Sequence, residues 1–227
     1  MKKILSVLIC AALLLAGCGT MNDATKGGLI GGGSGAAVGA GVGALITKDG
    51  KGTAIGAAIG SVVGAGVGVL IGHKMDKKAE ELAALENAKV DTVLDANNLK
   101  AIKITFDSGI LFNTSSFALS DASKRDLTEF ASKMADMPDT DLTVIGHTDH
   151  TGTAEYNHQL SIDRAKAVAT YLKNAGMKNH MSIEGRSFLE PVADNSTREG
   201  RLQNRRVEIY ITANDKMIED AENGSLN

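Results

Sequence analysis

The sequence lacks residues on which several common classes of protein depend. Its 227 residues include no Trp, two Pro and two Cys, and aromatic residues make up 4% of the chain. The formal net charge is −3, so the chain has neither a basic excess nor a set of aromatic rings on which bases could stack. This composition argues against a nucleic-acid-binding protein. Two cysteines are also too few for a framework of disulfides.

The first 18 residues have the pattern of a bacterial lipoprotein signal. Lys2 and Lys3 precede an apolar run, 4–15, that is too short to span a bilayer. The small residues before Cys18 resemble a lipobox, in which the peptide is cut before the cysteine and the thiol carries a diacylglycerol. We therefore predict a signal peptide over residues 1–17. An ordinary signal peptide with a chance cysteine is the alternative.

Cleavage before Cys18 has two consequences for the rest of the chain. Cys10 is removed, so the mature chain has a single cysteine and cannot form an internal disulfide. Residues 18–26 become a lipidated amino terminus and spacer. The residue after the cysteine is Gly19 and not Asp, which resembles the enteric lipoproteins that are sorted to the outer membrane.

Glycine is abundant, with 26 residues, and most of it lies before residue 75. Two apolar runs, 27–46 and 52–72, carry a glycine at every fourth position and flank a polar turn. On a helix this spacing forms a smooth glycine face, which lets helices pack closely in lipid. Twenty helical residues span roughly 30 Å, the thickness of a hydrocarbon core. We predict a membrane-inserted helical hairpin over 27–72, with a flexible glycine spacer as the alternative.

Beyond the glycine-rich region the pattern changes twice. Residues 73–98 are charged and rich in alanine, and they predict a helical stalk. Residues 99–213 predict a compact α+β domain, and 214–227 a polar, frayed tail. The strands expected in this domain are 102–107, 141–146, 181–185 and 207–211, and the helices are 121–135, with Ser120 as its N-cap, 154–175 and a short one from 197.

The main candidate site follows the expected strand 141–146. Asp149 lies just past the end of this strand, and Arg164 lies in the helix that follows. A carboxylate and a guanidinium at one strand–helix junction suit a zwitterionic ligand. The carboxylate of Asp149 accepts hydrogen bonds from an ammonium, and the guanidinium of Arg164 donates hydrogen bonds to a carboxylate. The alternative is that Asp149 and Arg164 pair with each other and only stabilise the loop.

Several motifs across residues 99–213 together resemble the OmpA-like peptidoglycan-associating domain. They are Ile104-Thr105-Phe106-Asp107, Gly146-His147-Thr148-Asp149 with Gly152, Tyr156-Asn157 with Leu160-Ser161 and Arg164-Ala165, Tyr171-Leu172, and Gly200-Arg201 with Asn204 to Ile209. The resemblance implies a βαβαβ(α)β sandwich of helices on a mixed four-stranded sheet. The full chain resembles an OmpA-family lipoprotein with a glycine-zipper amino-terminal half, anchored in the outer membrane with its last domain in the periplasm.

The resemblance also implies a ligand and a set of residues that hold it. The ligand is the diaminopimelate of the peptidoglycan stem peptide, which is bound non-covalently, without a cofactor and without catalysis. Asp149 and Arg164 match the two residues that hold this group in the family. The other positions that match the family's site are Thr148, Asn157, Leu160, Asp107 and one of the two arginines Arg205 and Arg206.

The sequence is also compatible with two other functions. His147 to His150 resemble half of a zinc-hydrolase motif, but Ile145 stands where a further histidine is needed, and the domain has no thiol. Alternatively, the glycine zipper drives assembly into a homo-oligomer, and wall binding is secondary.

Overall fold

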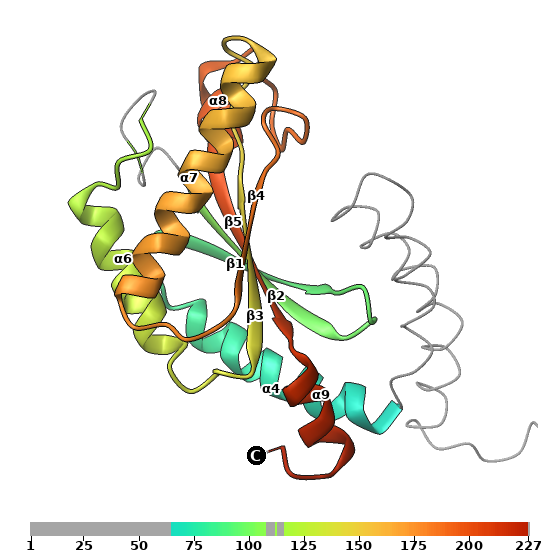
Figure 1. Cartoon of the computed structure of the whole chain (residues 1–227). Helices are drawn as coiled ribbons and strands as arrows, with labels where there is room; N and C mark the ends of the chain where they lie inside the picture. The colour runs from blue at the N-terminus through green and yellow to red at the C-terminus, as the bar shows by residue number, and fades with distance from the viewer. Residues whose placement is uncertain (1–64, 108–111, 113–115, 227) are drawn as a thin grey trace, which may run out of the picture.

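A five-stranded mixed sheet forms the centre of the computed structural model, which describes residues 65–107, 112 and 116–226 (Figure 1). The strands lie in the order β1-β2-β5-β3-β4. Strands β3 and β4 pair in parallel, and the other neighbours pair antiparallel. The strands are β1 (Ala88–Leu94), β2 (Lys100–Asp107), β3 (Thr140–Gly146), β4 (Met181–Gly185) and β5 (Arg206–Ala213).

Four of the described helices begin at a Ser, Thr or Asn side chain that caps the first turn. The N-cap residues Ser120, Thr153, Thr197 and Asn214 each accept a hydrogen bond from the backbone N–H three positions later. This satisfies one of the N–H groups that the first turn leaves unpaired, and it confirms Ser120 as a cap. The described helices are α4 (Ala65–Leu82), α6 (Asp121–Lys133), α7 (Ala154–Asn174), α8 (Arg198–Asn204) and α9 (Asp215–Glu222).

The core lies between the sheet and the helices on one of its faces. Along β5, Val207, Ile209 and Ile211 are fully buried and pack with residues of α6 and α7. Phe106 of β2 meets Phe130 of α6 edge to face, with the ring centroids 6.1 Å apart. The intervening residues of β5 point to the opposite, polar face of the sheet. The expected α+β sandwich of helices on a mixed sheet is confirmed.

The predicted helical stalk over 73–98 is wrong. Helix α4 ends at Leu82, and β1 pairs with β2 over Ala88–Leu94, so the sheet has five strands instead of four. Met75 and Leu82 of α4 are fully buried in the core of the domain. The domain therefore begins with α4, because the apolar side chains of this helix are buried in the core of the domain.

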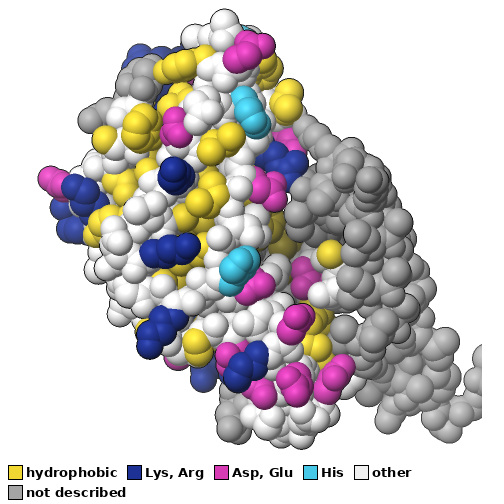
Figure 2. All heavy atoms as spheres, viewed as in Figure 1, with side chains coloured by type: hydrophobic (Ala, Val, Ile, Leu, Met, Phe, Trp, Pro, Cys, Tyr) yellow, Lys and Arg dark blue, Asp and Glu magenta, His cyan; other side chains and the backbone are white. Residues whose placement is uncertain are grey.

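The carboxyl-terminal segment is not a frayed tail either. It forms α9, whose Met217 and Ala221 are buried one turn apart against the core. Its outer face is acidic, and Figure 2 shows Asp and Glu side chains gathered at the lower end of the molecule, in the region of α9.

The predicted signal peptide, Cys18 and most of the predicted hairpin lie outside the described residues. Of the second glycine run, residues 65–72 are described and form the first turns of α4. Among the helices that the structure describes, none has the length and apolar character that a bilayer crossing needs.

Candidate ligand-binding site at the end of strand β3

The loop after β3 is held by backbone hydrogen bonds to distant parts of the chain. The N–H of His147 donates to the carbonyl of Arg206 at 2.9 Å, and the N–H of Thr148 donates to the carbonyl of Ser187 at 2.9 Å. Further along, the side chain of Asn157 donates to the carbonyl of Thr151 at 2.9 Å. The loop therefore has a defined shape before any ligand arrives.

Two glycines let the ends of β3 and β4 approach α7 closely. A Cβ on Gly146 would lie 2.0 Å from the carbonyl oxygen of Ser161, and one on Gly185 would lie 2.5 Å from its Oγ. The same Oγ accepts a hydrogen bond from the N–H of Ser187 at 3.1 Å. This contact places the loop after β4 beside the turn of α7 that precedes Arg164, and the hydrogen bond from Thr148 to Ser187 joins the loop that carries Asp149 to it.

Arg164 is almost completely buried, with 2% of its surface exposed. Its Nε donates to the carbonyl of Ser116 at 3.2 Å, and its guanidinium carbon lies 5.3 Å from the centre of the Phe112 ring. Its Nη1 has no hydrogen-bond partner among the residues that the structure describes. Burial, together with the nearby charge of Arg205, lowers the pKa of Arg164 to about 10. The side chain is thus a buried cation at neutral pH with a donor left over.

Asp149 is paired with Arg205 instead of Arg164. Its Oδ2 accepts from Nη1 of Arg205 at 2.7 Å, and its Oδ1 accepts from the N–H of Thr151 at 2.8 Å. Burial raises the pKa of Asp149, but the hydrogen bonds from Arg205 and Thr151 outweigh it and hold the pKa below its usual value. The carboxylate is therefore charged at neutral pH.

The structure brings most of the predicted residues together. Asn157, Leu160 and Arg164 lie on the buried face of α7, and Thr148 is buried beside them with a hydroxyl that has no partner within the described part of the chain. The backbone of Asp107 pairs with Arg206 at the end of β2, but its side chain lies outside the described residues.

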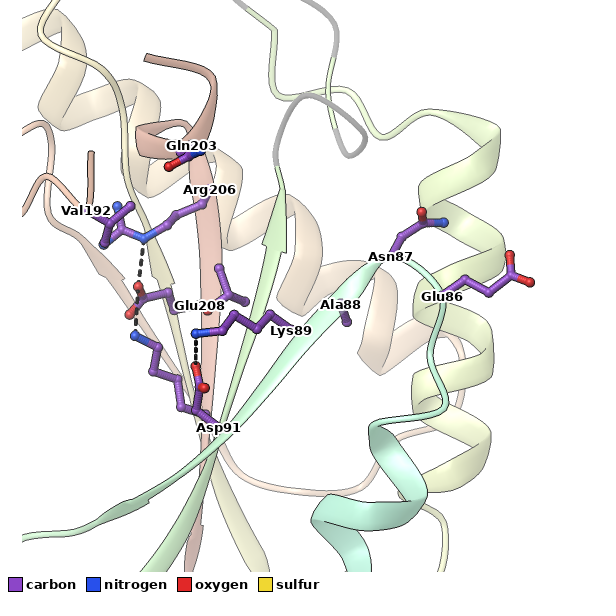
Figure 3. Close-up of a pocket in the computed structure, with 11 residues that line it drawn as sticks. Glu86, Asn87, Ala88, Lys89, Asp91, Val192, Gln203, Arg206 and Glu208 are labelled. Atoms are coloured by element: carbon purple, nitrogen blue, oxygen red, sulfur yellow. Dashed lines mark hydrogen bonds and ion pairs between the residues drawn. The ribbon is translucent and has the colours of Figure 1, made fainter. Parts of the chain in front are cut away.

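Arg206 does not belong to this site. Its side chain is buried on the opposite face of the sheet, where its Nε donates to Oε1 of Glu208 at 2.7 Å (Figure 3). The physical reason is the alternation of side chains along β5. Val207 faces the core, so Arg206 and Glu208 face away from it.

Three residues that contribute to the site were not predicted. Phe112 and Ser116 contact Arg164 from a loop whose sequence has no regular pattern, and their contacts span about fifty positions. Ser187 has a left-handed backbone, with φ at +52°, in the loop after β4. A serine in that conformation carries no sequence signal of its own, since glycine is the residue that favours it.

The structure also bears on the zinc alternative. Within the described ranges, no three His, Cys, Asp or Glu side chains gather closely enough to hold a metal ion. His147 is buried, and its Nε2 lies 3.8 Å from Oε2 of Glu208. Burial and the charge of Arg206 lower the pKa of His147 to about 3, so it stays neutral in the fold at physiological pH.

Comparisons with known proteins agree with this architecture. The OmpA family model matches residues 111–205, and the model of the YMGG-like Gly-zipper matches residues 1–76. Among solved structures, the cell wall anchor of the T6SS from Pseudomonas aeruginosa superposes with a TM-score of 0.51 at 29% identity, which covers 61% of this chain and 96% of that one.

Curated relatives match over different lengths. The peptidoglycan-binding protein ArfA of Mycobacterium bovis is 38% identical over 112 residues, or 49% of this chain and 34% of ArfA, so the chain spans about a third of that relative. The probable lipoprotein YiaD of Escherichia coli is 36% identical over 225 residues, which cover 93% of this chain and 99% of YiaD. The chain therefore belongs to the OmpA family, with a YMGG-like glycine-zipper region ahead of its OmpA domain.

Proposed function

We propose that this protein tethers the outer membrane to peptidoglycan by holding the stem peptide non-covalently between Asp149, Arg164 and Arg205. The observation that carries this proposal is Arg164, a buried guanidinium with one N–H donor unpaired among the described residues. Among the residues that the structure describes, this cation makes no ion pair, and a buried cation without one is costly, so its retention supports an anionic partner that arrives from outside. Asp149 supplies the opposite charge nearby.

The ligand chemistry that fits is diaminopimelate, which carries an amine and a carboxylate at each end. The carboxylate would accept from Nη1 of Arg164, and the ammonium would donate to Asp149 beside Arg205. Each charge-assisted hydrogen bond contributes about 1.5–3 kcal/mol when it is shielded from water. Binding at one site is then weak, but a wall offers very many sites, and an anchored protein stays close to them.

Attachment to the outer membrane would depend on the amino-terminal half of the chain. We propose that Cys18 carries the lipid and that residues 27–64, with the start of α4, lie in or on the outer membrane. The 36% identity to a probable lipoprotein over nearly the whole chain supports this assignment. The role is one of binding, without a reaction step.

Retention on purified sacculi tests the proposal. The full chain in detergent should sediment with diaminopimelate-containing sacculi, and Asp149→Ala or Arg164→Ala should reduce the bound fraction at least about tenfold, as expected for the loss of one shielded ionic contact. Glu129→Ala and Lys173→Ala, which remove exposed charges of the same kinds from α6 and α7, serve as matched controls. Equal retention of the wild type and the two site variants would contradict the proposal.

The match to the glycine-zipper model favours a second candidate function, self-assembly through residues 27–64. If the glycine face drives association, replacing Gly56, Gly60 and Gly64 by Leu should convert oligomers of the full chain to monomers in detergent. Sedimentation velocity measures the change. A monomeric wild type would exclude this role.

A further inference from the structure

A groove of about 560 Å³ lies on the polar face of the sheet (Figure 3), and neither Asp149 nor Arg164 is among its lining residues. Its walls come from β1, β2, β5, α8 and the segments before β1 and α8. The lining residues on which its chemistry depends are Lys89, Asp91, Lys103, Thr105, Gln203 and Glu208. Its volume falls in the range of about 300–1,000 Å³ that is usual for small-ligand sites.

The charges of the groove are already compensated within the protein. Glu208 accepts from Arg206 at 2.7 Å and lies 3.3 Å from Nζ of Lys103, while Lys89 pairs with Asp91 at 3.0 Å. Three acidic and three basic residues line the groove in total. An ionic ligand would have to break these pairs, so the groove favours a ligand without net charge.

The groups that remain available are neutral and polar. The amide of Gln203 and the hydroxyl of Thr105 make no side-chain hydrogen bond to the described residues, and Val192 adds an apolar surface that is 56% exposed. Glu208 and Arg206 are held in place by their pairing, so they form a fixed wall of the groove. Amide, hydroxyl and apolar groups together complement an N-acetylated sugar, which carries hydroxyls, an acetamide and an apolar ring face.

The groove is joined to the first site through two consecutive residues. Arg205 pairs with Asp149 at 2.7 Å on one side, and Arg206 pairs with Glu208 at 2.7 Å on the other. In peptidoglycan the stem peptide is covalently attached to a glycan strand, so a peptide at Asp149 brings sugar rings close to this part of the domain. We propose that the groove binds the N-acetylated glycan strand, an inference that rests on the proposed function.

Saturation-transfer NMR with a β-1,4-linked tetramer of N-acetylglucosamine tests this directly, using the full chain in detergent. The wild type should transfer magnetisation to the acetyl and ring protons of the sugar. The double variant T105V/Q203A should lower the affinity about thirtyfold, because it removes two neutral hydrogen bonds worth about 1 kcal/mol each. Gln159→Ala, an exposed amide on α7, is the control and should behave as the wild type.

The outcomes separate this inference from the proposed function. Asp149→Ala should keep the sugar signal even though it loses retention on sacculi, because the tetramer carries no peptide. Absence of transfer in the wild type, or an unchanged signal in T105V/Q203A, overturns the glycan site whatever the sacculi show. Sugar binding by the wild type together with unchanged retention of Asp149→Ala and Arg164→Ala on sacculi would instead overturn the peptide site alone.

Discussion

At the scale of single residues, the protein keeps two kinds of buried charge for different purposes. Glu208 is surrounded by partners, with Arg206, Lys103 and the Tyr210 hydroxyl all within 3.3 Å. Arg164 instead has one carbonyl, one aromatic ring and a donor with no partner in the described structure. A saturated charge stabilises the fold, whereas an unsaturated one is available for a ligand.

The loss of stability at acidic pH should depend on Glu208. Burial raises the pKa of Glu208, but Arg206 and the other neighbouring groups outweigh it and lower the pKa to about 2, against 4.5 for an ordinary Glu. Its contribution to the free energy of unfolding is therefore present above pH 4.5 and is lost as the pH falls toward 2. For this side chain, 5% exposed, the difference amounts to about 3 kcal/mol.

Urea denaturation of Glu208→Gln at pH 7 and pH 3 measures this contribution. The variant should be less stable than the wild type at pH 7, and the gap should narrow at pH 3. Glu129→Gln, an exposed acid on α6, should change stability by no more than about 0.5 kcal/mol at either pH. A gap that stays constant between the two pH values would contradict this role of Glu208.

At the scale of elements, close contacts of β3, β4 and α4 with their neighbours shape the domain. Strands β3 and β4 meet α7 through glycines that admit no side chain. Helix α4 is fixed at Lys78, whose Nζ contacts the carbonyl of Lys133 at 2.7 Å and Asp136 at 2.6 Å. The helix that leaves the glycine-rich region is therefore part of the domain.

Two glycine-to-alanine changes should have opposite effects on stability. Gly146→Ala places a Cβ 2.0 Å from a backbone oxygen, and overpacking of this kind should cost at least about 2 kcal/mol. Gly72→Ala, in the middle of α4, meets no described atom within 4 Å and should stabilise the helix by about 0.5–1 kcal/mol. Thermal unfolding of the two variants and the wild type measures whether each change raises or lowers the stability. A stabilising effect of Gly146→Ala would contradict the close contact between β3 and α7.

The packing of α4 predicts a further effect on stability. Leu82 is fully buried against the sheet, so Leu82→Ala should lower the free energy of unfolding by about 2–5 kcal/mol. Lys77→Ala, on the exposed side of the same helix, should change it by no more than about 0.5 kcal/mol. If urea denaturation finds the two variants equally stable, α4 does not pack as described.

At the scale of the whole molecule, the ligand site and α4 lie at opposite ends of the sheet. Figure 1 shows α8 and the start of α7 at the top, with α4, α9 and the carboxyl terminus below. Strand β3 alone, at about 3.3 Å per residue, extends over some twenty ångströms between the two ends. If the amino-terminal half is anchored in the membrane, this arrangement turns the site toward the wall.

The proposed lipid anchor predicts a difference between the two cysteines. Cells that express the wild type should incorporate labelled palmitate into the protein, and Cys18→Ser should abolish the incorporation. Cys10→Ser is the matched control, because residue 10 lies in the predicted signal peptide and would be removed with it. Equal labelling of Cys18→Ser and the wild type would refute the anchor.

Local chemistry in the sequence determined the features that depend on neighbouring residues. Three such features follow from positions that are close together in the chain. They are the cap at Ser120, the alternation of buried side chains from Val207 to Ile211, and the placement of Asp149 and Arg164 around one loop. The fold class was predictable for the same reason.

Only the tertiary structure decided what depends on distant partners. Residues 88–94 become a strand because they pair with β2, and without that partner their charged, alanine-containing sequence reads as a helix. Arg205 and Arg206 are neighbours of the same type, yet the end of α8 directs one to Asp149, and the pleat of β5 directs the other to Glu208. Burial and charge pairing are set by groups far away in the sequence, so they exist only once the chain has folded.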